Sequence, residues 1–128
     1  MTEQPQKLVI LVEDEEDIAR LIAHHLKLAG FHVHRPEKVS DLIADAERLC
    51  PSLFILDLML PEMDGFQLCR AVKAHRILHT IPILILTART AAEDRKRALE
   101  SGADQYMTKP FKPSVLLETV RTLASKIV

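Results

Sequence analysis

The fold of this chain is decided by residues 8–14, which read LVILVED. An unbroken apolar run of this length is typical of a strand buried on both faces of a sheet, and two carboxylates follow where that strand would end. Apolar residues then recur at helical spacing from Ile18 to Ala29, and Gly30 stands where a glycine commonly ends a helix. The opening of the chain therefore predicts a strand followed by a helix.

The same alternation recurs to the end of the chain. Strands are expected at 31–34, 53–56, 83–86 and 105–108, and helices at about 39–49, 66–72, 91–101 and 113–127. This pattern predicts an α/β fold, a doubly wound parallel sheet with helices on both faces. The most apolar strands belong inside the sheet, which gives five strands in the order 2-1-3-4-5 and five helices. Ligands bind such sheets at the carboxyl ends of the strands, beside the reversal of order.

Composition excludes several classes of protein. The chain has 128 residues, 48% of them hydrophobic and 27% charged, with a net charge of -1, which indicates one globular domain over residues 1–128 with a polar tail at about 1–6. No apolar run is long enough to cross a membrane and no signal-peptide core is present, so we expect a cytoplasmic protein. The even balance of charge argues against direct binding of nucleic acid.

The cysteines and glycines are few. Cys50 and Cys69 cannot make a disulfide framework, and both fall in apolar helical patterns, so we expect two buried, reduced thiols. With only three glycines, the common glycine-rich phosphate-binding loops cannot be written anywhere in the chain. Any phosphate chemistry must therefore use a different kind of site.

Polar side chains follow four of the predicted strands directly. They are Glu13 and Asp14 after the first strand, Asp57 after the third, Thr87 after the fourth and Lys109 at the end of the fifth. Neighbouring strands lie ~4.8 Å apart, so these side chains are expected to converge. Carboxylates at close quarters repel one another unless a cation is present, and oxygen ligands suit Mg²⁺ or Mn²⁺. A metal beside groups that hold an anion indicates phosphoryl chemistry, with Asp57 as the nucleophile.

Four motifs in this order resemble the receiver domain of two-component response regulators, the CheY-like family with a flavodoxin-like fold. They are VILVEDE at 9–15, DLMLPEMDG at 57–65, LTAR at 86–89 and GADQYMTKPF at 102–111. The likeness covers nearly the whole chain and is nearest to receivers of winged-helix transcriptional regulators. It implies a phosphorylation switch rather than an enzyme acting on a separate substrate.

The resemblance assigns roles around the acceptor. Asp57 is expected to receive a phosphoryl group from a histidine kinase or a phosphotransfer protein. Mg²⁺, or Mn²⁺ in its place, is expected to be bound directly by Asp14, Asp57 and the backbone carbonyl of Met59, with Glu13 helping through water.

The resemblance also implies how the signal leaves the site. Thr87 is expected to hydrogen-bond the phosphoryl group, Lys109 to form an ion pair with it, and Tyr106 to follow Thr87 inward. The peptide bond between Lys109 and Pro110 is expected to be cis. The surface of the fourth helix, fifth strand and fifth helix would then meet a downstream protein or output domain.

Two further positions are expected to set the lifetime of the phosphorylated state. In receivers, the side chains two residues after the acceptor and two after the threonine border the approach of water; here they are Met59 and Arg89. Methionine cannot hold water by a strong hydrogen bond, and arginine can lie over the phosphoryl group. Slow loss of phosphate is therefore expected.

Whether the chain acts alone is left open by its sequence. Receivers of winged-helix regulators dimerise on phosphorylation through ion pairs on the fourth helix, fifth strand and fifth helix. Arg95 matches that pattern, but Gln105, Val115 and Thr119 replace charged residues usual in the family. Both a stand-alone receiver and the N-terminal part of a DNA-binding regulator fit these residues.

Rivals from other classes each lack a residue. A phosphatase of the haloacid dehalogenase type carries a second Asp where this chain has Met59, and a flavodoxin-like cofactor carrier would not have an acidic loop after the first strand. A degenerate receiver would have lost acceptor and partner residues that this chain retains. Zinc is not expected at His32 and His34, or at His75 and His79, because neither pair has an evident third ligand.

Overall fold

The computed structural model describes residues 7–125. The polar tail expected at residues 1–6, and the end of the helix expected over 113–127 from residue 126 on, lie outside the described residues. The strands are β1 (Leu8–Val12), β2 (His32–His34), β3 (Leu53–Leu56), β4 (Ile83–Thr87) and β5 (Gln105–Thr108). They form one parallel sheet in the order β2-β1-β3-β4-β5, which confirms the predicted topology.

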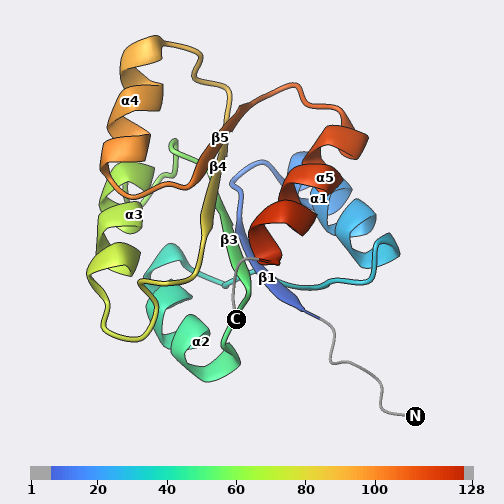
Figure 1. The fold of residues 1–128 in the computed structure, drawn as a ribbon, viewed down its shortest axis with the longest axis horizontal. Coiled ribbons are helices and arrows are strands. Elements are labelled where there is room, and N and C mark those ends of the chain that lie inside the picture. Colours follow the sequence, from blue (N-terminus) through green and yellow to red (C-terminus); the bar gives the residue numbers. More distant parts are fainter. Residues whose placement is uncertain (1–6, 126–128) are drawn as a thin grey trace.

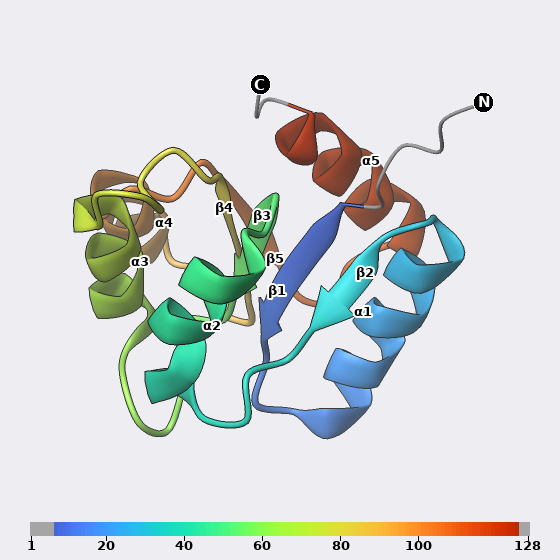
Figure 2. The same ribbon diagram turned by 90° about the horizontal axis from the view of Figure 1, so that it is seen from below.

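Helices cover both faces of this sheet (Figures 1 and 2). One face carries α1 (Glu16–Leu28) and α5 (Pro113–Ala124), and the other carries α2 (Leu42–Leu49), α3 (Gly65–Ala74) and α4 (Ala92–Glu100). A short 3₁₀ turn, Val39–Asp41, precedes α2, so the helix expected from residue 39 begins as a tighter turn. No helix within residues 7–125 is both long and apolar enough to cross a membrane.

Each face of the sheet has its own core. Every residue of β3 and β4 is buried, as are the last four of β1, because both faces of these inner strands are covered. Ile10, Phe54 and Ile85 face α2, α3 and α4, while Val9, Ile55 and Leu84 belong to the core under α1 and α5. β2 and β5 are the edge strands and are only partly buried, as their mixed sequences predicted.

The prediction of two buried thiols is confirmed for Cys69 and wrong for Cys50. Cys69 is buried in α3, and burial raises the pKa of its thiol to about 12. Cys50 is exposed. Proline disfavours a helical conformation in the residue before it, so Pro51 ends α2 at Leu49, and Cys50 takes a left-handed φ of 52° that turns it out of the apolar stripe.

Candidate functional site

The carboxyl ends of β1, β3 and β5 meet at the side chain of Lys109. Its Nζ lies 2.5 Å from Glu13 Oε1 and donates to Asp57 Oδ2 at 2.8 Å. The three side chains are almost buried, with 8%, 2% and 7% of their surfaces exposed for Lys109, Glu13 and Asp57. Burial lowers the pKa of Lys109, but its hydrogen bonds to Asp57 and Glu13, together with the attraction of their charges, outweigh burial and raise that pKa above its ordinary value. The site therefore holds an ammonium group between two carboxyl groups.

The second oxygen of each acid is held by backbone. Glu13 Oε2 accepts from the N–H of Glu15 at 3.0 Å, and Asp57 Oδ1 accepts from the N–H of Met59 at 3.1 Å. Each carboxylate is thus fixed at both oxygens, one by Lys109 and one by the loop that follows its own strand. Asp57 is presented in a single orientation at the rim of the sheet.

The loop between β3 and α3 is folded tightly over Asp57. A Cβ atom on Gly65 would lie 2.5 Å from the backbone oxygen of Asp57 and 2.6 Å from Leu58 Cα, so no side chain fits there. The Gly65 N–H donates to the Leu58 carbonyl at 3.0 Å, and Asp64 Oδ1 caps α3 by accepting from the Gln67 N–H at 2.8 Å. Glycine and the cap together fix the path of the loop that follows Asp57.

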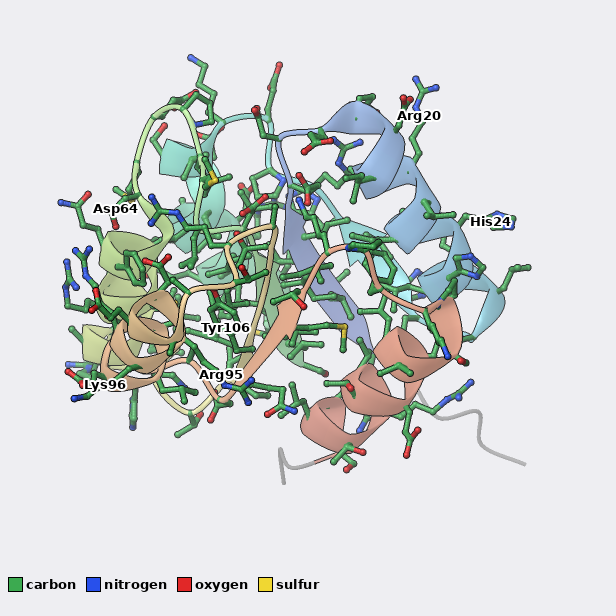
Figure 3. All side chains as sticks on the ribbon, turned by 90° about the horizontal axis from the view of Figure 1, so that it is seen from above. Arg20, His24, Asp64, Arg95, Lys96 and Tyr106 are labelled. Atoms are coloured by element: carbon green, nitrogen blue, oxygen red, sulfur yellow. The ribbon has the colours of Figure 1, made fainter. Side chains whose placement is uncertain are left out.

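Thr87 and Tyr106 are joined through the backbone of Arg89. Thr87 is fully buried, and its Oγ1 accepts from the Arg89 N–H at 3.4 Å. Tyr106 Oη donates to the Arg89 carbonyl at 2.8 Å, and burial raises the pKa of this phenol. Arg95 of α4 lies 6.0 Å from the Tyr106 ring, and Figure 3 shows the two side by side. The backbone N–H of Lys109 completes the group by donating to the Thr87 carbonyl at 2.8 Å.

Asp14 and Met59 stand outside this buried group. Asp14 is exposed and borders two hollows, one of about 210 Å³ toward Arg35 and one of about 500 Å³ shared with Met59 and Arg89. Within residues 7–125, no three His, Cys, Asp or Glu side chains are gathered so that they could hold a metal ion. The counter-charge for Glu13 and Asp57 is the ammonium, although the oxygen donors of this rim are chemically those that Mg²⁺ prefers.

The end of β2 carries a charged residue that was not among the predicted site residues. Arg35 follows that strand directly, and its guanidinium pairs with the carboxylate of Glu16 at the start of α1. The signal that selected the other rim residues, a charged side chain just after a strand, would also have selected Arg35. The peptide between Lys109 and Pro110 is cis, as expected.

Residues 9–121 match the family described as the response regulator receiver domain, and the chain belongs to this family. It is 42% identical over 118 residues to the transcriptional regulatory protein GltR of Pseudomonas aeruginosa, covering 90% of this chain and 48% of that protein. It is 41% identical over 123 residues to the transcriptional regulatory protein CreB of Escherichia coli, covering 95% of this chain and 52% of the other. The chain thus spans about half the length of these curated relatives.

Solved structures agree with the family. A response regulator structure from Chloroflexus aurantiacus, described as putative, superposes with a TM-score of 0.90 at 30% identity, covering 95% of this chain and 100% of that one. The BeF3-activated receiver domain of RstA from Klebsiella pneumoniae gives 0.86 at 30% identity, covering 94% and 100%. The receiver domain of the sensor histidine kinase PA1611 from Pseudomonas aeruginosa, with a magnesium ion in its active site cleft, gives 0.86 at 27% identity, covering 95% and 100%.

Proposed function

We propose that this chain is a cytoplasmic phosphorylation switch of a two-component system, a single receiver domain over residues 1–128 with Asp57 as the phosphoacceptor. The observation that carries the proposal is the ammonium of Lys109 held 2.8 Å from a nearly buried aspartate at the rim of a parallel sheet. A histidine kinase or phosphotransfer protein supplies the phosphoryl group. Asp57 attacks phosphorus, the P–N bond to the donor imidazole breaks, and a P–O bond to the carboxylate forms.

Mg²⁺ would be held by Asp14, Asp57 and the Met59 carbonyl, with Glu13 acting through water, and Mn²⁺ would serve in its place. A bound divalent ion supplies neutralisation of charge on the phosphoryl oxygens. The magnesium ion in the active site cleft of the PA1611 receiver supports this assignment. Lys109 supplies a second positive charge at the same rim from this chain itself.

Phosphorylation adds about −1.5 to −2 charges near neutral pH. Thr87 and Lys109 respond by contacting the phosphoryl oxygens, and Tyr106 follows through the Arg89 backbone that joins it to Thr87. The surface formed by α4, β5 and α5 then changes its population of states and meets a downstream protein or output domain. The chain itself does no other chemistry than gaining and losing this phosphoryl group.

A second candidate is the same switch working as the N-terminal part of a DNA-binding regulator. It is favoured by the curated relatives, which are transcriptional regulatory proteins about twice the length of the matched region. A phosphorylation-dependent dimer would then be expected. The case for the usual ion-paired dimer is weakened by Gln105, Val115 and Thr119. The mass of the phosphorylated protein in solution distinguishes a monomer from a dimer.

Phosphate incorporation tests the acceptor. The wild-type chain is offered a phosphorylated histidine kinase and, separately, acetyl phosphate, each with and without Mg²⁺. Wild type should be labelled only with Mg²⁺, and Asp57→Asn should not be labelled, because an amide is no nucleophile here. Asp64→Asn is the matched control, since asparagine caps α3 as well as aspartate and the labelling should persist. Stable labelling of Asp57→Asn would move the acceptor elsewhere, with Asp14 the first suspect.

Calorimetry tests the metal. Asp14→Ala should weaken Mg²⁺ binding in the absence of phosphate, because it removes a direct oxygen ligand. Asp17→Ala removes an equal charge from an exposed position in the first turn of α1 and serves as the control. Equal affinity in the Asp14 and Asp17 variants contradicts a ligand role for Asp14.

A further inference from the structure

The guanidinium of Arg35 forms a bidentate ion pair with the carboxylate of Glu16. Its two terminal nitrogens lie 2.9 and 3.0 Å from the two Glu16 oxygens. Arg35 directly follows β2, and Glu16 is the first residue of α1, so the pair joins two elements across 19 residues of chain. A bidentate arginine–carboxylate pair fixes orientation as well as distance.

This pair lies at one end of the acidic loop, residues 13–15. β1 ends at Val12 and α1 begins at Glu16, so the loop has only three residues. Glu13, the first residue of the loop, is paired with Lys109, and Glu16, which follows the loop, is paired with Arg35. Asp14 lies between these two fixed points and borders the same hollow of about 210 Å³ as Arg35.

We infer that Arg35 is a positioning residue for the divalent-cation site, holding the loop at residues 13–15 so that Asp14 is already in place when the cation arrives. The inference rests on the proposed function. A loop that is ordered before binding loses less conformational entropy on binding. Direct partners of metal ligands typically contribute ~10–100-fold to affinity. Arg35 acts one step further away, so removal of its side chain should weaken Mg²⁺ binding by roughly three- to tenfold.

Simple charge predicts the opposite result, which makes the inference testable. Arg35 is a cation near the site. Its hydrogen bonds to Glu16 are the main reason that the pKa of Arg35 is raised, and the negative charge of Glu13 adds a smaller contribution. As a bare charge, Arg35 would repel Mg²⁺, so Arg35→Ala would tighten binding. Glu16→Ala would weaken Mg²⁺ binding by the same electrostatic argument, because it removes a negative charge. Loss of positioning instead predicts weaker binding in both variants.

Arg20 provides a matched control. Its Nε donates to the same Glu16 carboxylate at 3.1 Å, but from one turn further along α1, so it joins no second element. Figure 3 shows Arg20 on the outer side of α1, away from the sheet. Arg20→Ala removes the same charge and a contact to the same carboxylate while leaving the bridge between β2 and α1 intact.

The experiment measures Mg²⁺ affinity by calorimetry and amide exchange of residues 13–15 by NMR, both on the whole unphosphorylated chain. Arg35→Ala and Glu16→Ala should each weaken Mg²⁺ binding and speed amide exchange. The double variant should bind Mg²⁺ no more weakly than the weaker-binding of the two single variants, because both remove the same contact. Arg20→Ala should resemble wild type. Arg35→Lys should recover only part of the affinity, because an ammonium cannot make the paired contact.

Unchanged or tighter Mg²⁺ binding in Arg35→Ala overturns the inference, and so does unchanged amide exchange in the loop. A wild-type chain that neither binds Mg²⁺ nor accepts phosphate overturns the proposed function instead. The two failures are distinguishable because the wild-type measurements come first and involve no variant.

Discussion

Tyr106 Oη donates a hydrogen bond of 2.8 Å to the backbone carbonyl of Arg89. The N–H of the same residue donates to Thr87 Oγ1 at 3.4 Å, so Arg89 is held from both sides through its backbone. The contact with Thr87 is long and therefore weak, while the contact with Tyr106 is short. Movement of the Thr87 hydroxyl toward a phosphoryl group would release one end of this link and leave the other in place.

Tyr106→Phe should loosen the loop after β4. The substitution removes one buried hydrogen bond, so the free energy of unfolding should fall by about 0.5–1.5 kcal/mol, measured by denaturant titration followed by circular dichroism. Amide exchange at residues 88–91 should speed up, while exchange in α1 stays as in wild type. Equal exchange at residues 88–91 in both proteins would mean that the phenol does not hold this loop.

Thr87→Ala and Lys109→Ala should permit some phosphorylation but blunt the response. Each removes a group that we propose contacts the phosphoryl oxygens, and a charge-assisted contact of ~1.5–3 kcal/mol would shift a two-state population more than tenfold. Lys109→Ala should also destabilise the chain, because Glu13 and Asp57 lose their shared counter-charge. Lys112→Ala, which is exposed, is the control. NMR shifts in α4 and β5 equal to those of phosphorylated wild type would contradict both roles.

Gly65→Ala should disturb the acceptor directly. The new methyl group would lie 2.5 Å from the Asp57 backbone oxygen, so the loop must move, at a cost of about 1–3 kcal/mol in stability and with slower phosphorylation. Gly30→Ala is the matched control, because its φ of +96° makes alanine strained there while no atom lies within 4 Å. It should lose stability and keep its phosphorylation rate. Slowing in both variants would trace the effect to stability alone.

The pairing of Glu16 should be visible in its titration. Hydrogen bonds from Arg35 are the main reason that the pKa of Glu16 falls from 4.5 to about 2. Because the folded-state pKa is the lower one, the stabilisation is present above pH 4.5 and is lost as the pH falls toward 2. Arg35→Ala should return the pKa toward 4.5, followed by the NMR shift of the Glu16 carboxyl carbon. An unmoved pKa would show that Arg35 does not hold this carboxylate in solution.

Met59 and Arg89 should prolong the phosphorylated state. Met59 is 56% exposed beside the hollow that Arg89 also borders. Methionine cannot hold an attacking water by a strong hydrogen bond, and the long cationic side chain of Arg89 can lie over the phosphoryl group. Met59→Asn combined with Arg89→Glu should lose phosphate faster than wild type. Asp94→Ala, which removes the 3.4 Å partner of Arg89 without changing either residue, tests whether that pairing matters. A double variant with unchanged phosphate loss would show that these side chains do not set the lifetime.

The sheet order and the rim could be read from sequence because both depend on local pattern. Buried strands are continuous apolar runs, and the residue after such a run must stand at the rim. The pairing of Arg35 with Glu16 could not be predicted from sequence, because it joins two elements and leaves no periodic pattern. The exposure of Cys50 follows from a single neighbour, Pro51, which outweighs the helical stripe around it.

The single buried residue of α4, Ala98, has a consequence for how such domains diversify. Substitutions in a packed core are felt throughout a domain, whereas exposed positions tolerate change with little effect on stability. The other eight residues of α4 are not buried, so most substitutions there should leave the sheet beneath them intact. In a lineage of duplicated genes, the sequence of this helix could therefore diverge from copy to copy while the arrangement of Asp57 and Lys109 stays the same.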